Sequence, residues 1–137
     1  MGATYDNGTA GVGATLTFGS TISAIDGVTL SNGDRILVLG YTGADEPLNG
    51  IYTRTSGTVW TRSTDFDTAA EIAGGDFVFN TEGTIYNNTG WVQTNNVATV
   101  GTDDVIFQQF SGAGTYTAGI GLSLSGSTFN VNLGAVS

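Results

Sequence analysis

Glycine interrupts this chain at short intervals: 22 of the 137 residues are glycine and only one is proline. Because Thr, Ser and Asn occupy many of the neighbouring positions, the pattern is typical of many short strands joined by turns. The aromatic and β-branched residues between the glycines favour packed strands over disorder. The length suits one domain that buries a core of its own. We therefore expect an all-β domain.

Short apolar segments recur along the chain at intervals that suit a small antiparallel β-sandwich or a barrel-like sheet. Residues 14–18 alternate between apolar and polar side chains, as a half-buried strand does. Residues 35–41, RILVLGY, form a continuous apolar run, so we expect a central strand that is buried on both faces. The other strands are predicted at residues 26–30, 49–55, 58–62, 76–80, 84–88, 90–94 and 105–110.

A hairpin is predicted around Ser56-Gly57, a dipeptide that can form a two-residue turn. A turn of that length would place Thr53 opposite Trp60. It would also put Arg54 and Arg62 on opposite faces of the hairpin.

Only residues 67–73 have a helical pattern, which would give one short helix. Asp67 or Thr68 could be the N-cap, and Thr68 with Glu71 has the spacing of a capping box. A pair of glycines follows and would end the helix after one or two turns. By contrast, residues 42–50 contain the single proline and are predicted to form an exposed loop.

The charge excludes several classes of function. The net charge is −9, with twelve acidic residues, three arginines and no lysine or histidine. Such a surface repels nucleic-acid phosphates and anionic membranes, so neither is an expected partner. The absence of cysteine excludes disulfides, zinc–thiolate sites and cysteine nucleophiles, and the absence of histidine excludes a Ser-His-Asp triad.

Other motifs of targeting and ligand binding are missing from the sequence. No apolar run approaches the length of a transmembrane helix, and the N-terminus has no basic and apolar regions of a signal peptide. There is no phosphate-binding loop, dinucleotide fingerprint or metal motif. We therefore expect no cofactor and no metal.

The last part of the chain differs from the rest, because residues 111–137 carry no charge and alternate between apolar and small residues. They predict a hairpin with an apolar stripe that must be covered, either by the same domain or by neighbouring subunits. We expect the second solution, with residues 1–110 as a globular β domain and residues 1–13 as a flexible or extended lead. The residues expected to make the trimer contact are Leu122, Leu124, Phe129, Val131 and Leu133.

The order of several motifs resembles a domain that is widespread in tail-fibre and related virion proteins of tailed bacteriophages. From about Gly27 to the C-terminus, the motifs are DGVTLSNGDRILV, NGIYT, WTRSTDFDTAAEI, GTIYNNTGWVQT and VGTDDVIFQQFSGAG, followed by the AGIGLSLSG stretch. The resemblance implies a homotrimeric part of a virion, made in the cytoplasm of the bacterial host, with other fibre or baseplate proteins as partners. It transfers no catalytic residues.

Two carboxylates near the middle of the chain invite an enzymatic interpretation. Asp65 and Asp67 follow Trp60 closely, and glycosidases use two carboxylates on either side of a sugar. The alternative is turn and cap chemistry, with Asp65 in an Asx-turn and Asp67 as an N-cap, and we favour it. A calcium loop is a poor match, because Ala69 and Ala70 stand where oxygen ligands or glycine are needed.

Two arginines are expected to act structurally. Arg62 precedes the two carboxylates and could form a bidentate pair that fixes a loop, and Arg35 could do the same with another acid. Four aromatic residues could instead stack on a sugar, although their places on alternating strands favour core or subunit contacts. These candidate ligand-contact residues are Trp60, Trp91, Tyr52 and Tyr86.

The sequence therefore favours a non-enzymatic structural module of a phage tail fibre or related appendage, homotrimeric and used in assembly and host attachment. A lectin-like domain that itself binds a host surface glycan is the alternative. A polysaccharide depolymerase and a head-fibre or capsid-decoration protein are two further classes.

Overall fold

The computed structural model describes residues 2–112, 122–125 and 128–131. As expected, the chain forms an all-β fold, and every strand pair is antiparallel. One sheet has five strands in the order β1-β2-β7-β6-β5, and neither it nor the other sheets closes into a barrel. Its strands are β1 (Ala3–Asp6), β2 (Thr15–Phe18), β5 (Arg35–Val38), β6 (Gly50–Arg54) and β7 (Val59–Arg62).

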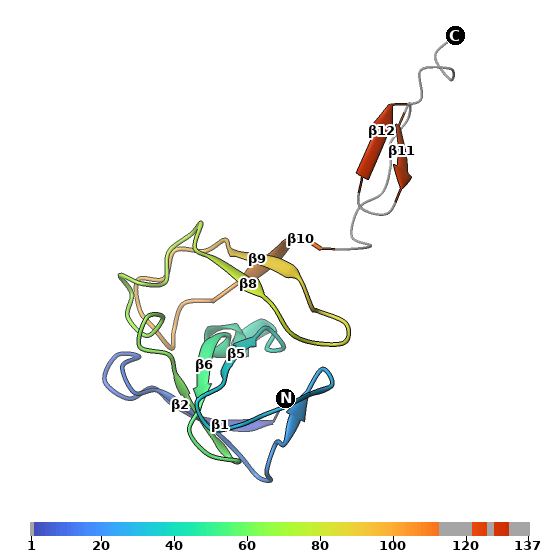
Figure 1. Ribbon diagram of the computed structural model, residues 1–137. Coiled ribbons are helices and arrows are strands. Elements are labelled where there is room, and N and C mark those ends of the chain that lie inside the picture. The colour runs from blue at the N-terminus through green and yellow to red at the C-terminus, as the bar shows by residue number, and fades with distance from the viewer. Residues whose placement is uncertain (1, 113–121, 126–127, 132–137) are drawn as a thin grey trace.

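A second sheet has three strands in the order β10-β9-β8 and lies across the β5–β6 hairpin from β1 and β2 (Figure 1). Two short hairpins complete the described strands. The second sheet contains β8 (Phe77–Asn80), β9 (Thr89–Gln93) and β10 (Phe107–Ser111), and the hairpins are β3 (Ala24–Ile25) with β4 (Val28–Thr29) and β11 (Leu122–Ser125) with β12 (Thr128–Val131).

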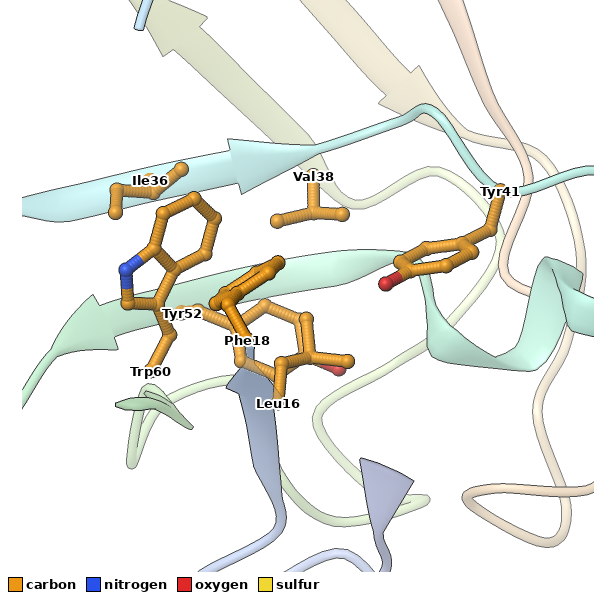
Figure 2. Close-up of a cluster of buried hydrophobic side chains, with 7 residues drawn as sticks. All are labelled: Leu16, Phe18, Ile36, Val38, Tyr41, Tyr52 and Trp60. Carbon is orange, nitrogen blue, oxygen red and sulfur yellow. The ribbon is translucent and has the colours of Figure 1, made fainter. Parts of the chain in front are cut away.

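The first core cluster lies on one face of the five-stranded sheet. Figure 2 shows Ile36 and Val38 of β5 pointing toward the rings of Trp60 and Phe18. The centroids of those two rings are 4.5 Å apart, and the rings are tilted by 59°. The whole cluster consists of Leu16, Phe18, Ile36, Val38, Tyr41, Tyr52 and Trp60. Each large apolar side chain buried here contributes roughly 1.5–3 kcal/mol to stability.

The second core cluster lies on the opposite face of the β5–β6 hairpin. Ile51 of β6 is buried in it and Leu37 of β5 packs against it, together with Val78 and Phe107 from the three-stranded sheet. The remaining members come from the connections between strands: Phe66, Ile72, Val97, Val100 and Val105. The cluster joins the two sheets into one domain.

The apolar run of residues 35–41 is covered on both sides, as predicted, because alternate residues of β5 enter different clusters. Ile36 belongs to the first cluster, whereas Leu37 packs against the second. The prediction of a central strand is wrong, since β5 is the last strand of its sheet. A second layer of structure buries the strand, and a second neighbouring strand is not needed.

The β6–β7 hairpin differs from its predicted register by one residue. Arg54 pairs with Trp60, and Tyr52 pairs with Arg62, because residues 55–58 form a longer connection than a two-residue turn. The peptide N–H groups of Thr55 and Ser56 both donate to the carbonyl oxygen of Val59, each at 2.9 Å. Arg54 and Arg62 therefore project from the same face of the sheet, and not from opposite faces.

The predicted strand at residues 26–30 is instead half of a tight hairpin. Ile25 pairs with Val28, so Asp26-Gly27 forms the turn between β3 and β4. Both turn residues have positive φ, 47° and 78°, as a type I′ turn requires. The predicted strand at residues 84–88 does not form either, because this segment is held by the hairpin tip, as described below.

The short helix lies elsewhere than predicted. Residues 43–48 form a 3-10 helix, η1 (Gly43–Leu48), where we expected an exposed loop. Residues 67–73 form turns without a helix. Even so, one contact of the predicted capping box is present, since the peptide N–H of Thr68 donates to the Glu71 carboxylate at 3.2 Å. The Thr68 hydroxyl donates to the same carboxylate at 2.9 Å, and the Glu71 N–H binds the Thr68 carbonyl oxygen and not the hydroxyl.

Both ends of the described chain form strands. Residues 1–13 were expected to be a lead with little to bury, but Ala3–Asp6 forms the first strand of the five-stranded sheet and pairs with β2. The predicted C-terminal hairpin is confirmed in its backbone, in which Leu122 pairs with Val131 and Leu124 with Phe129. Leu133 lies outside the described residues.

Candidate functional site

A groove runs along the outer edge of β5 and is the candidate binding site of the domain. Its volume is about 200 Å³. Three elements enclose it: the β3–β4 hairpin, the edge strand β5, and the segment that runs from the end of β8 into β9. The residues that line it include Ile25, Val28 and Leu30 on the hairpin side, Arg35 to Leu37 and Leu39 along the edge, and Asn80, Glu82, Tyr86 and Trp91 opposite.

The carboxylate of Asp26 holds the two sides of the groove together. It accepts hydrogen bonds from the peptide N–H groups of Ile85, at 2.9 Å, and Tyr86, also at 2.9 Å. The Asp26 carbonyl accepts a third bond from the N–H of Thr84 at 2.8 Å. The bond from Tyr86, followed by that from Ile85, holds the pKa of Asp26 below its ordinary value. The turn thus fixes a loop nearly sixty residues away in the sequence.

Two glycines permit this close approach. A Cβ atom at Gly27 would lie 2.3 Å from the Thr84 hydroxyl oxygen, and a Cβ at Gly83 would lie 2.2 Å from an Asp26 carboxylate oxygen. Both glycines have positive φ, so a side chain would be strained there even without the contact. The contact could have been anticipated in part, because Asp-Gly between apolar residues is a strong signal for a hairpin turn.

The four candidate ligand-contact aromatics divide into two pairs. Tyr52 and Trp60 are fully buried in the first core cluster, so they are not available to a ligand. Tyr86 is 49% exposed and lines the groove together with the partly buried Trp91. The centroids of the Tyr86 and Trp91 rings are 6.0 Å apart, and the rings meet edge to face at 64°.

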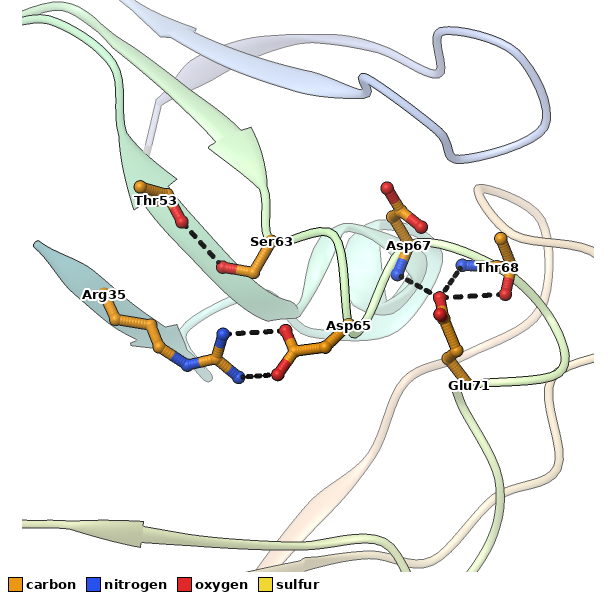
Figure 3. Close-up of polar contacts among 7 residues, drawn as sticks. All are labelled: Arg35, Thr53, Ser63, Asp65, Asp67, Thr68 and Glu71. Carbon is orange, nitrogen blue, oxygen red and sulfur yellow. Dashed lines mark hydrogen bonds and ion pairs between the residues drawn. The ribbon is translucent and has the colours of Figure 1, made fainter. Parts of the chain in front are cut away.

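The pair predicted between Arg35 and an acid forms, and the acid is Asp65. Figure 3 shows the Arg35 guanidinium facing the Asp65 carboxylate in a bidentate pair, with N–O distances of 2.7 and 2.8 Å. Hydrogen bonding from Arg35 holds the pKa of Asp65 below its ordinary value. Asp65 therefore serves in an ion pair, and the predicted Asx-turn role is wrong.

Arg62 is buried and binds no carboxylate, contrary to the prediction. Its guanidinium donates to the carbonyl oxygens of Pro47, at 2.7 Å, and Asn49, at 3.1 Å. It also lies over the ring of Tyr52, with 5.1 Å between the guanidinium carbon and the ring centroid. Arg62 thus fixes the end of η1 against the sheet, so the prediction of loop fixing holds but not the predicted partner.

Asp67 and Glu71 form a neighbouring pair of acids. Burial, followed by a hydrogen bond to the Glu71 carboxylate, raises the pKa of Asp67 above its ordinary value. The hydrogen bond from the Thr68 hydroxyl is the main reason that the pKa of Glu71 is lowered. Thr68, and not Asp67, makes with its side chain the contact to Glu71 that was predicted for a helix start. Neither Asp65 nor Asp67 lines the groove beside β5, so they do not flank a sugar in it.

A second surface of interest is the outer face of the three-stranded sheet. Phe77 and Phe79 of β8 are 54% and 47% exposed, and Phe110 of β10 is 51% exposed. The ring centroids of Phe77 and Phe110 are 4.7 Å apart. We call Phe77, Phe79 and Phe110 the aromatic face. Residues 77–79 are all apolar, so the predicted strand at residues 76–80 did not show which of its sides faces outward.

Other kinds of site are not found in the described part of the chain. No group of three or more acidic residues there is placed to hold a metal ion. Within the same residues, no helix has the length and apolar character needed to cross a membrane. No family model, curated protein or solved structure matches the chain. The groove and the aromatic face therefore carry the functional argument.

Proposed function

We propose that the protein is a homotrimeric structural module of a phage tail fibre or related virion appendage, and that it acts in assembly and host attachment without catalysing a reaction. The aromatic face carries the proposal. Exposed apolar patches on soluble proteins mark interaction surfaces more often than chance would give. The virion context and the number three come from the resemblance of the ordered motifs to phage fibre domains.

The distribution of charge supports self-association through this side of the molecule. All twelve acids of the chain precede residue 105, and residues 105–137 carry no charge. Copies with a net charge of −9 repel one another over most of their surface. Contact through an uncharged aromatic face and an uncharged C-terminal segment avoids that repulsion. A closed symmetric assembly would cover the same patch on every copy.

Trimerisation would also serve attachment. Three copies present the same surface side by side, so weak contacts of each copy with a host cell sum to a much stronger attachment. This advantage requires no catalytic group.

Sedimentation analysis at micromolar concentration tests the proposal. We expect a trimer of the 14.0 kDa chain. The double variant Phe77→Ser/Phe79→Ser should dissociate at concentrations at which the parent protein stays assembled. Ile85→Ser is a matched control, because Ile85 is 74% exposed but lies outside the aromatic face, and it should leave assembly unchanged. A monomeric parent protein would contradict the proposal.

A further inference from the structure

The groove beside β5 borders an open sheet edge. Arg35, Ile36 and Leu37 all line it, although successive side chains of a strand point to opposite faces. Only a groove along the edge of the strand meets all three. No described strand pairs with that outer edge. The site therefore offers main-chain groups as well as side chains.

The register of the β5–β6 pair identifies these main-chain groups. The N–H of Arg54 donates to the carbonyl of Asp34 at 2.9 Å, so Asp34 stands at a hydrogen-bonded position of the ladder with β6. Bonded and non-bonded pairs alternate in an antiparallel ladder. Ile36 and Val38 thus bond toward β6, and the peptide groups of Arg35 and Leu37 point into the groove.

Most polar side chains of the groove are already engaged within the domain. Asp26 binds the loop after β8, and the Asp34 carboxylate accepts a bond from the N–H of Ser31 at 2.7 Å. The Asn80 amide donates to the carbonyls of Glu82 and Tyr86 at 2.8 and 2.7 Å. Few side-chain groups remain to bind the hydroxyls of a sugar.

The shape of the groove also disfavours a sugar. Tyr86 and Trp91 meet edge to face and form no flat platform. The volume of about 200 Å³ is below the roughly 300–1,000 Å³ of small-molecule sites. What the groove offers is an aliphatic wall on the hairpin side, a polar and aromatic wall opposite, and a peptide edge between them. An added β-strand uses all three.

We propose that the groove binds the C-terminal hairpin, β11–β12, of a second copy as an added strand along β5. The hairpin is itself two-stranded, so each of its strands has an outer edge. Its sequences, LSLS and TFNV, alternate apolar with small polar residues, which matches one aliphatic and one polar wall. It also carries no acid, and three acids, Asp26, Asp34 and Glu82, surround the groove. The inference rests on the proposed self-association and identifies the surfaces that meet.

Disulfide trapping in the full-length chain tests the contact, because the chain contains no native cysteine. One copy carries Val28→Cys on the groove wall, and a second, tagged copy carries a single cysteine at one of residues 122 to 125. Mixed copies are treated with a mild oxidant. A disulfide requires Cβ atoms about 4 Å apart, so it reports direct contact. Thr29→Cys is the matched control, since Thr29 is exposed on the same hairpin and does not line the groove.

We expect mixed disulfides with Val28→Cys to form at least about tenfold faster at alternate positions of β11 than at the positions between them. The Thr29→Cys control should give no such pattern. Equal rates for the two variants, or no mixed disulfide in a protein that sediments as a trimer, would overturn the inference and leave the proposed function standing. A monomeric protein would overturn both. Glycan binding lost in Val28→Lys and kept in Thr29→Lys would assign the groove to a sugar instead.

Discussion

In the five-stranded sheet the large aromatic residues point inward, and Trp60 and Tyr52 have no exposed surface. In the three-stranded sheet, Phe77 and Phe79 point outward and keep about half of their surface exposed. The apolar side chains of the first core cluster are buried within a single copy of the protein. The second sheet packs Val78 against the second core cluster and leaves Phe77 and Phe79 half exposed on its other face. The difference separates the part of the molecule that holds the fold together from the part that is suited to a partner.

Matched truncations of the two sheets should have very different effects on the stability of one copy. Trp60→Ala leaves a cavity in the first cluster and should lower the free energy of unfolding by about 3–5 kcal/mol. Phe79→Ala removes an exposed ring and should change it by less than about 0.5 kcal/mol in the dissociated chain. Urea denaturation at low protein concentration measures both. If both variants lost the same free energy of unfolding, the two sheets would not differ in their contribution to the stability of one copy.

The link at Asp26 between the β3–β4 hairpin and the loop after β8 should break with a smaller and local effect. In Asp26→Ala, the amides of Ile85 and Tyr86 lose their acceptor, so we expect faster hydrogen exchange there and little change in β6. Asp34→Ala, which alters the same groove but not this loop, is the control. Unchanged exchange at both amides would show that the carboxylate does not hold the loop.

Acid should reproduce this effect in the parent protein. The pKa of Asp26 is lowered in the folded chain, so the ionised form contributes stability above the ordinary value of 3.8. That contribution is lost as the pH falls through the lowered pKa. Exchange at Ile85 and Tyr86 should therefore approach that of Asp26→Ala in strong acid.

The smallest effects should come from the two acids that follow β7, and they should have opposite signs. The raised pKa of Asp67 means that ionisation costs stability as the pH rises, so Asp67→Asn should stabilise the protein at neutral pH and not below pH 3.8. Asp65→Asn loses the exposed pair with Arg35 and should cost less than about 1 kcal/mol at neutral pH. Thermal melts across this pH range measure both. If both variants changed the melting temperature in the same direction at neutral pH, the opposite roles of Asp65 and Asp67 would be contradicted.

The sequence predicted well what depends on local pattern. Alternation located β2, short apolar segments between turn residues located β8 and β9, and the contact between Thr68 and Glu71 formed although the helix did not. Prediction from the sequence failed where a residue far away in the chain determines the local structure. The segment at residues 84–88 has the composition of a strand, but Asp26 binds its peptide groups. No local pattern reveals a partner so far away in the chain.

The candidate site was predicted less completely than the fold. Among the four aromatic residues named as ligand contacts, Tyr86 is exposed and lines the groove, and its contact with a ligand stays a prediction. The edge position of β5 was missed, because a continuous apolar run indicates burial of both faces and not the number of neighbouring strands. The prediction for Arg35 was correct, but that for Arg62 failed for a similar reason, as the register of one hairpin decides which face Arg62 occupies.

The β5–β6 hairpin has one further consequence. Since Ile36 and Leu37 are adjacent in one strand and contribute to different clusters, neither cluster can open without disturbing the wall of the other. The two halves of the domain should therefore melt in a single transition. Force applied to the domain would meet one cooperative unit, which either stays folded or yields as a whole.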